Sequence, residues 1–156
     1  STFHSNDAAT TIPRLLDMEV EPFLLASTLE LVIAQRLIRK ICENCRYGSK
    51  ADKNTFKKLP EHIRADVAKN ITTIYQGKGC TNCGETGFNG RTAIYEFIAI
   101  SPEMEDLILT NPSKKQIWEL ARVQGSTSLF EDGLAKVKSG MTTLDELLRV
   151  AEPPRE

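Results

Sequence analysis

The sequence predicts an α/β fold over its first two thirds and a small helical bundle over its last third. Two segments rich in β-branched and aromatic residues, Leu31–Ile41 and Gly90–Ile100, are strand candidates, and a cysteine-bearing insertion separates them. After Ser101-Pro102 the chain shows helix start and stop signals to its end. Its 156 residues, 40% of them apolar and 26% charged, suit one domain or one domain with a small satellite.

The chain begins with a polar stretch, Ser1–Asp7, and helix signals follow it. Three N-cap residue types in a row predict a helix that begins near Asp7. Pro13 removes a hydrogen bond from a helix interior, so we expect two short helical pieces that meet near Thr11-Ile12. Pro22 fits the first turn of a further helix.

The two strand candidates differ in clarity. Periodicity alone leaves Leu31–Ile41 between helix and strand, and its β-branched residues favour a strand. Gly90–Ile100 is the clearer strand, with residues that suit a pleated and mostly buried surface. Between them, Pro60–Ile71 is expected to form a helix within the insertion.

The last third contains four helix candidates. Ser101 is an N-cap residue followed by Pro102 and by acids in the opening turn, and Gly125 is a stop signal after the second helix. The four expected helices are Ser101–Asn111, Ser113–Gly125, Ser128–Gly140 and Thr142–Val150.

The strongest chemical signal is a set of four cysteines in two C-x-x-C pairs, Cys42/Cys45 and Cys80/Cys83. A two-residue gap lets both thiolates of a pair face one ion from a tight turn, and Gly84 supports the second turn by tolerating a positive φ. Two such turns supply four sulfurs in the closed tetrahedral geometry of structural Zn²⁺. Such a site leaves no open position for water or substrate, so its expected role is to hold the insertion folded.

Other uses of these cysteines are two disulfides, a thioredoxin-like redox pair or a rubredoxin-like iron site. Disulfides are uncommon in cytosolic proteins, and two C-x-x-C pairs together favour a metal. His62 lies inside the insertion, but with four thiolates available we interpret it as an ordinary helix histidine.

The charge distribution is uneven although the net charge is only −1. The segment Arg36–Lys78 holds eleven Lys and Arg against four Asp and Glu, a balance of +7 that leaves −8 for the remainder. Basic segments of this kind form solvated faces or contact phosphate on nucleic acid or anionic lipid. No apolar run reaches the roughly 20 residues that span a bilayer, and no secretion signal pattern opens the chain, so a cytoplasmic protein is expected.

The order of motifs resembles a known family. The chain contains "STFHSNDA", "VIAQRLIRKIC-x-x-C", a spacer, "C-x-x-C-G-x-TGFNGRTAIYEF" and "FEDGLAKVKSGMTTLDELLRV". This order is similar to that of the hexameric ATPases of type II secretion and type IV pilus assembly (the GspE/PilB type). The resemblance covers essentially the whole chain, and the cysteine pairs are typical of assembly motors that contain a tetracysteine lobe.

The resemblance implies a fold and a division of the chain. Residues 1–41 would be the end of a RecA-like P-loop NTPase core, 42–84 a zinc-binding lobe, 85–100 a returning core strand and 101–156 a helical subdomain. The stretch "STFHSND" corresponds to the family's His box, which makes His4 a candidate sensor of the nucleotide's terminal phosphate, with Thr2, Asn6 and Asp7 as neighbours. The implied cofactors are structural Zn²⁺ and, in a full-length parent, ATP and Mg²⁺.

The implied partners are further copies of the chain in a hexamer and the inner-membrane platform protein of the machine, with peripheral membrane association and no nucleic acid. One departure from the family concerns the phosphate-binding loop. The single Gly-Lys pair, Gly77-Lys78, is followed by Gly79 and has Thr72 where a Walker A loop has its first glycine. Walker B is missing as well, so we expect the isolated chain to be the inactive C-terminal portion of a motor.

Two other functions fit the same residues. A free-standing zinc ribbon could bind nucleic acid through Arg39, Lys40, Arg46, Lys57 and Lys58, although aromatic residues for base stacking are few there. A protein-interaction scaffold is the third interpretation.

Overall fold

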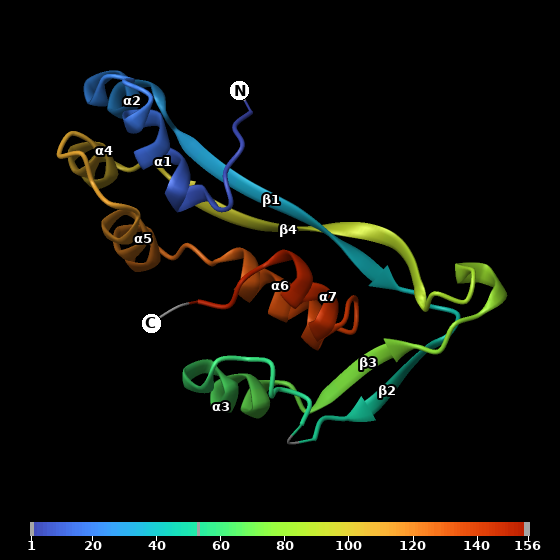
Figure 1. Ribbon diagram of the computed structural model, residues 1–156. Helices are drawn as coiled ribbons and strands as arrows, with labels where there is room; N and C mark the ends of the chain where they lie inside the picture. The colour runs from blue at the N-terminus through green and yellow to red at the C-terminus, as the bar shows by residue number, and fades with distance from the viewer. Residues whose placement is uncertain (1, 53, 155–156) are drawn as a thin grey trace. The chain divides into compact units, whose positions relative to one another are not determined.

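The structure is a computed structural model that describes residues 2–52 and 54–154. It confirms the mixed α/β fold (Figure 1). Ser1, at the start of the predicted segment 1–41, and residues 155–156, at the end of 101–156, lie outside the described residues. In chain order the elements are α1 (Ala8–Asp17), α2 (Pro22–Thr28), β1 (Leu31–Ile41), β2 (Arg46–Lys50), α3 (Glu61–Asn70), β3 (Thr73–Gly77), the 3-10 turn Thr81–Cys83, β4 (Phe88–Ala99), α4 (Pro102–Ile108), α5 (Lys114–Val123), α6 (Leu129–Lys138) and α7 (Leu144–Val150).

The chain divides into two compact units. The first contains the chain up to Gln35 together with Tyr95–Leu129, and the second contains Arg36–Ile94 together with the chain from Phe130 onward. The strands β1 and β4 pass through both units.

The expected break at Pro13 is wrong, because α1 continues through it as one helix. Asp7 caps this helix, and Oδ1 of Asp7 accepts the N–H of Thr10 at 2.8 Å. The proline removes one hydrogen bond, whereas the buried side chains of Ala8, Ala9 and Ile12 keep α1 in the core. Burial therefore outweighs the local cost of the proline.

The core of the first unit is built by helices packed against one end of the β1/β4 pair. Helix α2 packs on α4, and α1 packs on α5. The expected cap of α4 is present, since Ser101 accepts the N–H of Met104, and α5 is capped in the same way by Ser113, which accepts the N–H of Gln116. The buried side chains of this core come from four helices and both strands: Ala8, Ala9, Ile12, Leu25, Ala26, Val32, Ile98, Met104, Ile108, Ile117 and Ala121.

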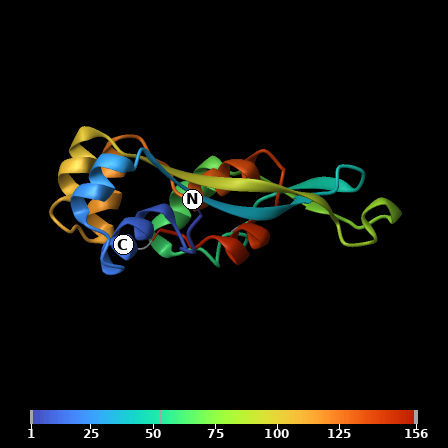
Figure 2. The same ribbon diagram turned by 90° about the horizontal axis from the view of Figure 1, so that it is seen from above.

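Strands β1 and β4 form a two-stranded sheet and lie side by side in both ribbon views (Figures 1 and 2). The N–H of Ile100 donates to the C=O of Glu30, and the N–H of Cys42 donates to the C=O of Gly87, each at 2.9 Å. These opposite ends show that the strands run antiparallel, and that the ambiguous segment Leu31–Ile41 is a strand.

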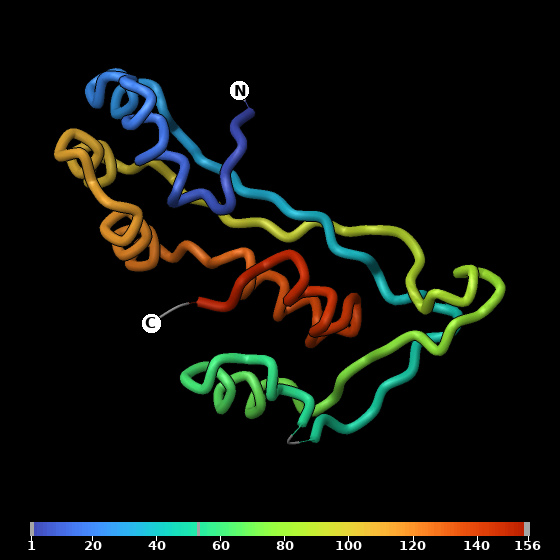
Figure 3. Tube along the Cα trace, viewed as in Figure 1, coloured from blue at the N-terminus to red at the C-terminus, as the bar shows by residue number. Residues whose placement is uncertain are grey.

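The second unit contains a two-stranded antiparallel sheet that the sequence patterns do not predict, and α3 lies in the connection between its strands. Strands β2 and β3 pair antiparallel, with Tyr47 opposite Gln76 and Ser49 opposite Ile74. Figure 3 follows the chain from β3 through the second cysteine turn into β4. The predicted helix of the insertion is present as α3.

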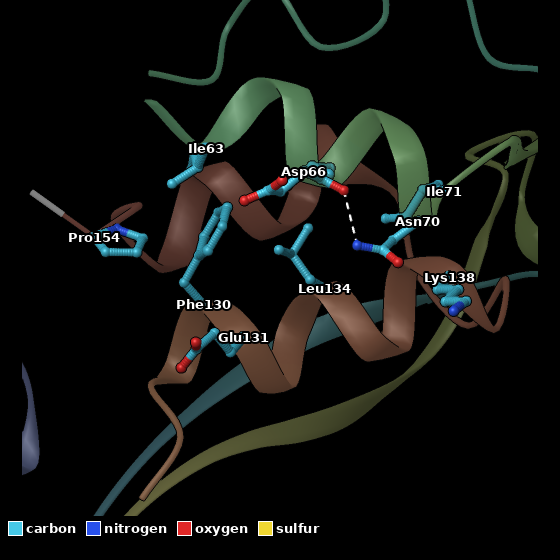
Figure 4. A pocket seen from close by; sticks show the side chains of 10 residues that line it. Ile63, Asp66, Asn70, Ile71, Phe130, Glu131, Leu134, Lys138 and Pro154 are labelled. Carbon is cyan, nitrogen blue, oxygen red and sulfur yellow. Dashed lines mark hydrogen bonds between the residues drawn. The ribbon is translucent and has the colours of Figure 1, made fainter. Parts of the chain in front are cut away.

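Helices α3 and α6 of this unit face each other across a groove of about 340 Å³ (Figure 4). Its walls are mostly apolar, with Ile63 and Ile71 on one side and Phe130 and Leu134 on the other. The groove is the seam that joins the helix of the insertion to the C-terminal helices.

Candidate functional site

The structure brings the four predicted cysteines together at the end of the β1/β4 pair. All four Sγ atoms lie within 4.8 Å of one another. The Sγ–Sγ distance is 3.8 Å for Cys42 and Cys80, 3.9 Å for Cys45 and Cys83, and 3.7 Å for Cys80 and Cys83. The sulfurs thus form a compact four-donor cluster.

Each cysteine pair sits on its own tight turn. The N–H of Cys45 donates to the C=O of Cys42 at 3.3 Å, and that of Cys83 to the C=O of Cys80 at 3.1 Å. Gly84 has a φ of 58°, as the sequence predicts for the residue after the second pair. Both turns therefore point their thiols at one position.

Two facing glycines make this arrangement possible. A Cβ atom added at Gly77 would lie 2.2 Å from the carbonyl oxygen of Gly87, so the two main chains leave no room for a side chain between them. The end of β3 and the segment that leads into β4 can therefore pass at backbone distance beside the cysteines.

The cluster fits a tetrahedral metal ion. Sulfurs about 2.3 Å from a central ion stand about 3.8 Å apart in a regular tetrahedron. A disulfide requires about 2.05 Å between the sulfurs, and all four cysteines are free. The four cysteines can therefore hold a metal ion, and they do not form the disulfide pairs considered as an alternative.

The thiols also interact electrostatically. Burial raises the pKa of the Cys45 thiol to about 12, and bonding to the other three thiols acts in the same direction. Burial also acts on Cys83, but the N–H groups of Cys80 and Gly87 donate to its sulfur and lower its pKa to about 6. Four thiolates this close together repel one another, so their joint ionisation needs a cation among them.

His62 lies outside this cluster, as predicted. It is an exposed residue of α3, and its Nε2 is 3.0 Å from the carbonyl oxygen of Pro154.

The polar stretch before α1, from Thr2 to Asp7, lies in the first unit and leads directly into that helix. The His4 side chain is exposed, and its carbonyl oxygen accepts a hydrogen bond from Nη1 of Arg14 at 2.9 Å. Oδ2 of Asp7 is 2.5 Å from Nζ of Lys114, so Asp7 joins α1 to α5 as well as capping α1. Thr2 and Asn6 are exposed. The structure thus presents His4 on a main chain that is anchored to α1.

Sequence reasoning missed Glu96, a buried acid beside this stretch. Its Oε1 accepts the N–H of Ala8 at 2.7 Å. Burial raises the pKa of Glu96, and the nearby charge of Asp7 adds to that rise. The available signal is a single acid in the apolar run "AIYEFIAI" of β4, at a strand position that faces the core.

None of the helices in residues 2–52 and 54–154 has both the length and the apolar character required to cross a membrane.

Comparison with known proteins identifies the family. The profile of the type II/IV secretion system protein family matches residues 1–149. The chain is 40% identical to the type IV pilus assembly ATPase PilB of Thermus thermophilus, over 95% of this chain and 16% of that protein. It is 39% identical to the type II secretion system protein E of Pseudomonas aeruginosa, over 96% of this chain and 29% of that protein. It is 35% identical to the type II secretion system ATPase E of Vibrio cholerae, over 97% and 29%.

The chain therefore spans between about a sixth and a third of these relatives, while they match nearly all of it. The family profile covers almost the full chain, and the relatives include both pilus assembly and secretion proteins. The chain belongs to the type II/IV secretion system protein family.

Proposed function

We propose that the chain is the C-terminal part of a cytoplasmic hexameric motor that hydrolyses ATP to power type II secretion or type IV pilus assembly. The observation that carries this proposal is the match of nearly the whole chain to proteins named as pilus assembly and secretion ATPases. ATP and Mg²⁺ belong to the full-length parent, because phosphoryl transfer requires a Walker A loop that this sequence lacks.

Within that motor, His4 is the proposed contact to the terminal phosphate of ATP. Its exposed side chain and its anchored main chain support this role. The test is ATP hydrolysis by the full-length parent with Mg²⁺ present. We expect His4→Ala to lower kcat on the order of a hundredfold, the size of a lost proton-transfer or positioning group.

The matched control is His62→Ala in the same protein, because His62 is an exposed histidine of α3. We expect it to hydrolyse ATP at the wild-type rate. A parent protein that hydrolyses no ATP would contradict the motor itself, and equal rates for the two variants would contradict only the role of His4.

We assign structural Zn²⁺ to the four-cysteine cluster. Four thiolates at tetrahedral spacing are a closed zinc site, and an ion held by Cys42, Cys45, Cys80 and Cys83 would fix both turns. Metal analysis of the purified chain should give one zinc per chain, and Cys80→Ser should lose it while Thr81→Ala keeps it. Iron in place of zinc would show a rubredoxin-like site instead.

The basic segment Arg36–Lys78 is the proposed docking face for the inner-membrane platform protein or for anionic lipid beside it. Lys57 and Lys58 are exposed, and Lys58 already pairs with Asp145 across an Nζ–Oδ1 distance of 2.5 Å. The cleaner charge reversal is therefore Lys57→Glu. It should reduce the stimulation of ATP hydrolysis by the platform protein, whereas Lys115→Glu on the exposed face of α5 should not.

One observation favours the nucleic-acid alternative enough to test it. Nζ of Lys78 lies 5.3 Å from the ring centroid of Tyr47, which is an exposed residue of β2. Aromatic rings beside cations are a common surface for single-stranded nucleic acid. Tight DNA binding by the chain that weakens steeply with salt would support this alternative over the motor.

A further inference from the structure

Glu96 is a buried carboxylate that the proposed function does not use. It is only 4% exposed, although it lies on β4 between the exposed rings of Tyr95 and Phe97. Its Oε1 accepts the N–H of Ala8 at 2.7 Å, a short bond typical of a charged acceptor. The main-chain N–H groups of Ala9 and Leu129 also act to lower the pKa of this carboxylate, against the effect of burial.

These donors are the free N–H groups at the start of α1 and at the residue where α6 begins. The first N–H groups of a helix have no partner within the helix, so a carboxylate placed there satisfies them and is attracted by the helix dipole. Asp7 satisfies Thr10 in the same first turn of α1. Glu96 therefore completes the cap of α1 from a strand that lies 88 residues further along the chain.

The bond to Ala8 differs from the other contacts that hold the His4 stretch. Arg14 bonds to the carbonyl of His4 and Lys114 pairs with Asp7, and both of these contacts are exposed. The bond between Ser5 Oγ and Thr11 Oγ1, at 2.8 Å, is partly buried. The Ala8–Glu96 bond is buried and excluded from water. It ties the start of α1, from which the main chain leads back to His4, to strand β4.

A carboxylate in this place has a specific use. Its burial has a large desolvation cost, but an apolar side chain would leave the buried N–H of Ala8 without an acceptor. The carboxylate therefore holds the main chain at the start of α1, and the His4 stretch continues from that point.

We propose that Glu96 is a positioning residue that fixes the main chain of the His4 stretch, and so sets where the His4 imidazole meets the terminal phosphate. This inference rests on the proposed function of His4. A displacement of about 1 Å in such a group can reduce the rate of reaction strongly without changing how substrate binds.

The test compares Glu96→Gln, His4→Ala and the double variant in the full-length parent. The amide keeps one oxygen that can accept the N–H of Ala8, but it loses the negative charge and puts an N–H₂ group in place of the second oxygen, so the bond to Ala8 should weaken and the local path should shift. We expect kcat to fall on the order of tenfold with KM for ATP unchanged within about twofold. The matched control is Glu105→Gln, which makes the same chemical change on an exposed face of α4 and should keep wild-type kinetics.

The double variant separates positioning from stability. If Glu96 acts through His4, its loss costs nothing further once His4 is replaced, and the double variant should match His4→Ala. The inference would be overturned if the kcat losses of the two single variants multiplied in the double variant. It would also be overturned if Glu96→Gln had a wild-type kcat while His4→Ala had a reduced one. A wild-type kcat for His4→Ala would instead overturn the proposed role of His4.

A stability control accompanies the kinetics, because the variant can also weaken the fold. If Glu96→Gln does not fold, Glu96→Asp takes its place, since it keeps the charge and withdraws the oxygens by one methylene. The same kcat loss and the same absence of a further loss with His4→Ala are expected, and a wild-type kcat for a folded Glu96→Asp counts against the inference.

Discussion

Glu146 shows how one buried charge can be held by the fold. Its side chain is 1% exposed, and Arg39 donates to its Oε2 through Nε and Nη2 at 3.0 and 2.8 Å. Arg149 donates to Oε1 at 2.7 Å. Burial raises the pKa of Glu146, but the hydrogen bonds from Arg149 and Arg39 outweigh it and lower the pKa to about 2.

This geometry predicts a large loss of stability for Glu146→Gln. At pH 7 the free energy of unfolding, measured with urea, should fall by about 3 kcal/mol, because both arginines lose a buried partner. The folded pKa lies below the ordinary value of 4.5, so the contribution is complete above pH 4.5 and disappears as the pH falls toward 2.

The difference between wild type and Glu146→Gln should therefore shrink over that interval. Glu119→Gln removes an exposed pair with Lys115 at 3.8 Å and should cost less than about 0.5 kcal/mol. A constant difference down to pH 2 would show that the ionised form of Glu146 is not what the arginines stabilise.

At the scale of residues, sequence patterns locate the cysteines but neither Glu96 nor Glu146. Cysteines can be recognised because two C-x-x-C pairs in one chain are typical of a metal site and have few other functions. A glutamate in a strand or helix looks like any solvated acid, and the partners here are Ala8 and Arg39, 88 and 107 residues away. Only the fold brings them together.

Among the elements, the sheet of β2 and β3 packs against one turn of the second unit. A Cβ at Gly140 would lie 2.8 Å from ring carbons of Tyr75, and Gly140 has a φ of 74°. The carbonyl of Gly140 also accepts Nη1 of Arg46 at 3.2 Å. The turn after α6 therefore packs directly against β2 and β3.

We expect Gly140→Ala to lower the free energy of unfolding by two additive effects. A positive φ costs an alanine about 1 kcal/mol, and overlap with a packed ring adds about 1–3 kcal/mol. Gly90→Ala is the matched control, since Gly90 has a φ of 75° and nothing within 4 Å of the added Cβ. Thermal or urea unfolding should show the larger loss at Gly140, and equal losses would mean that Tyr75 moves aside freely.

The four-cysteine cluster makes a second prediction about elements. If it holds the proposed Zn²⁺, Cys80→Ser should release the ion and expose β2, β3 and α3 to solvent, because the two turns lose their common anchor. The core of α1, α2, α4 and α5 contains none of these residues and should keep its protection. Hydrogen exchange by mass spectrometry gives both results at once, and loss of protection in α4 or α5 would show that the lobe does not unfold independently.

Sequence patterns predict the elements unevenly. The helices of the last third follow from start and stop signals, and the structure contains the predicted cap Ser101. Strand β2 escapes prediction because all five of its residues are exposed, so no alternation marks it. The predicted division of α1 is wrong because it rests on the local cost of Pro13, whereas the burial of Ile12 decides the outcome.

For the whole molecule, the chain represents less than a third of each relative named above. Its first unit exposes neighbouring apolar side chains, which are usually covered by another part of a protein or by a partner. Leu31 and Ile33 are exposed at alternate positions of β1, and Tyr95 and Phe97 are exposed at alternate positions of β4. The two rings stack with centroids 5.5 Å apart.

This face predicts that the isolated chain associates with itself. Apolar side chains exposed on a two-stranded sheet favour pairing between chains, and the association should strengthen with concentration. Sedimentation velocity should therefore show larger species at higher concentration for wild type, and fewer for Phe97→Lys and Ile33→Lys. The control Val123→Lys changes an apolar side chain that is 85% exposed and belongs to α5 and to neither strand. If it suppresses association as much as Phe97→Lys does, general charge and not this face controls the association.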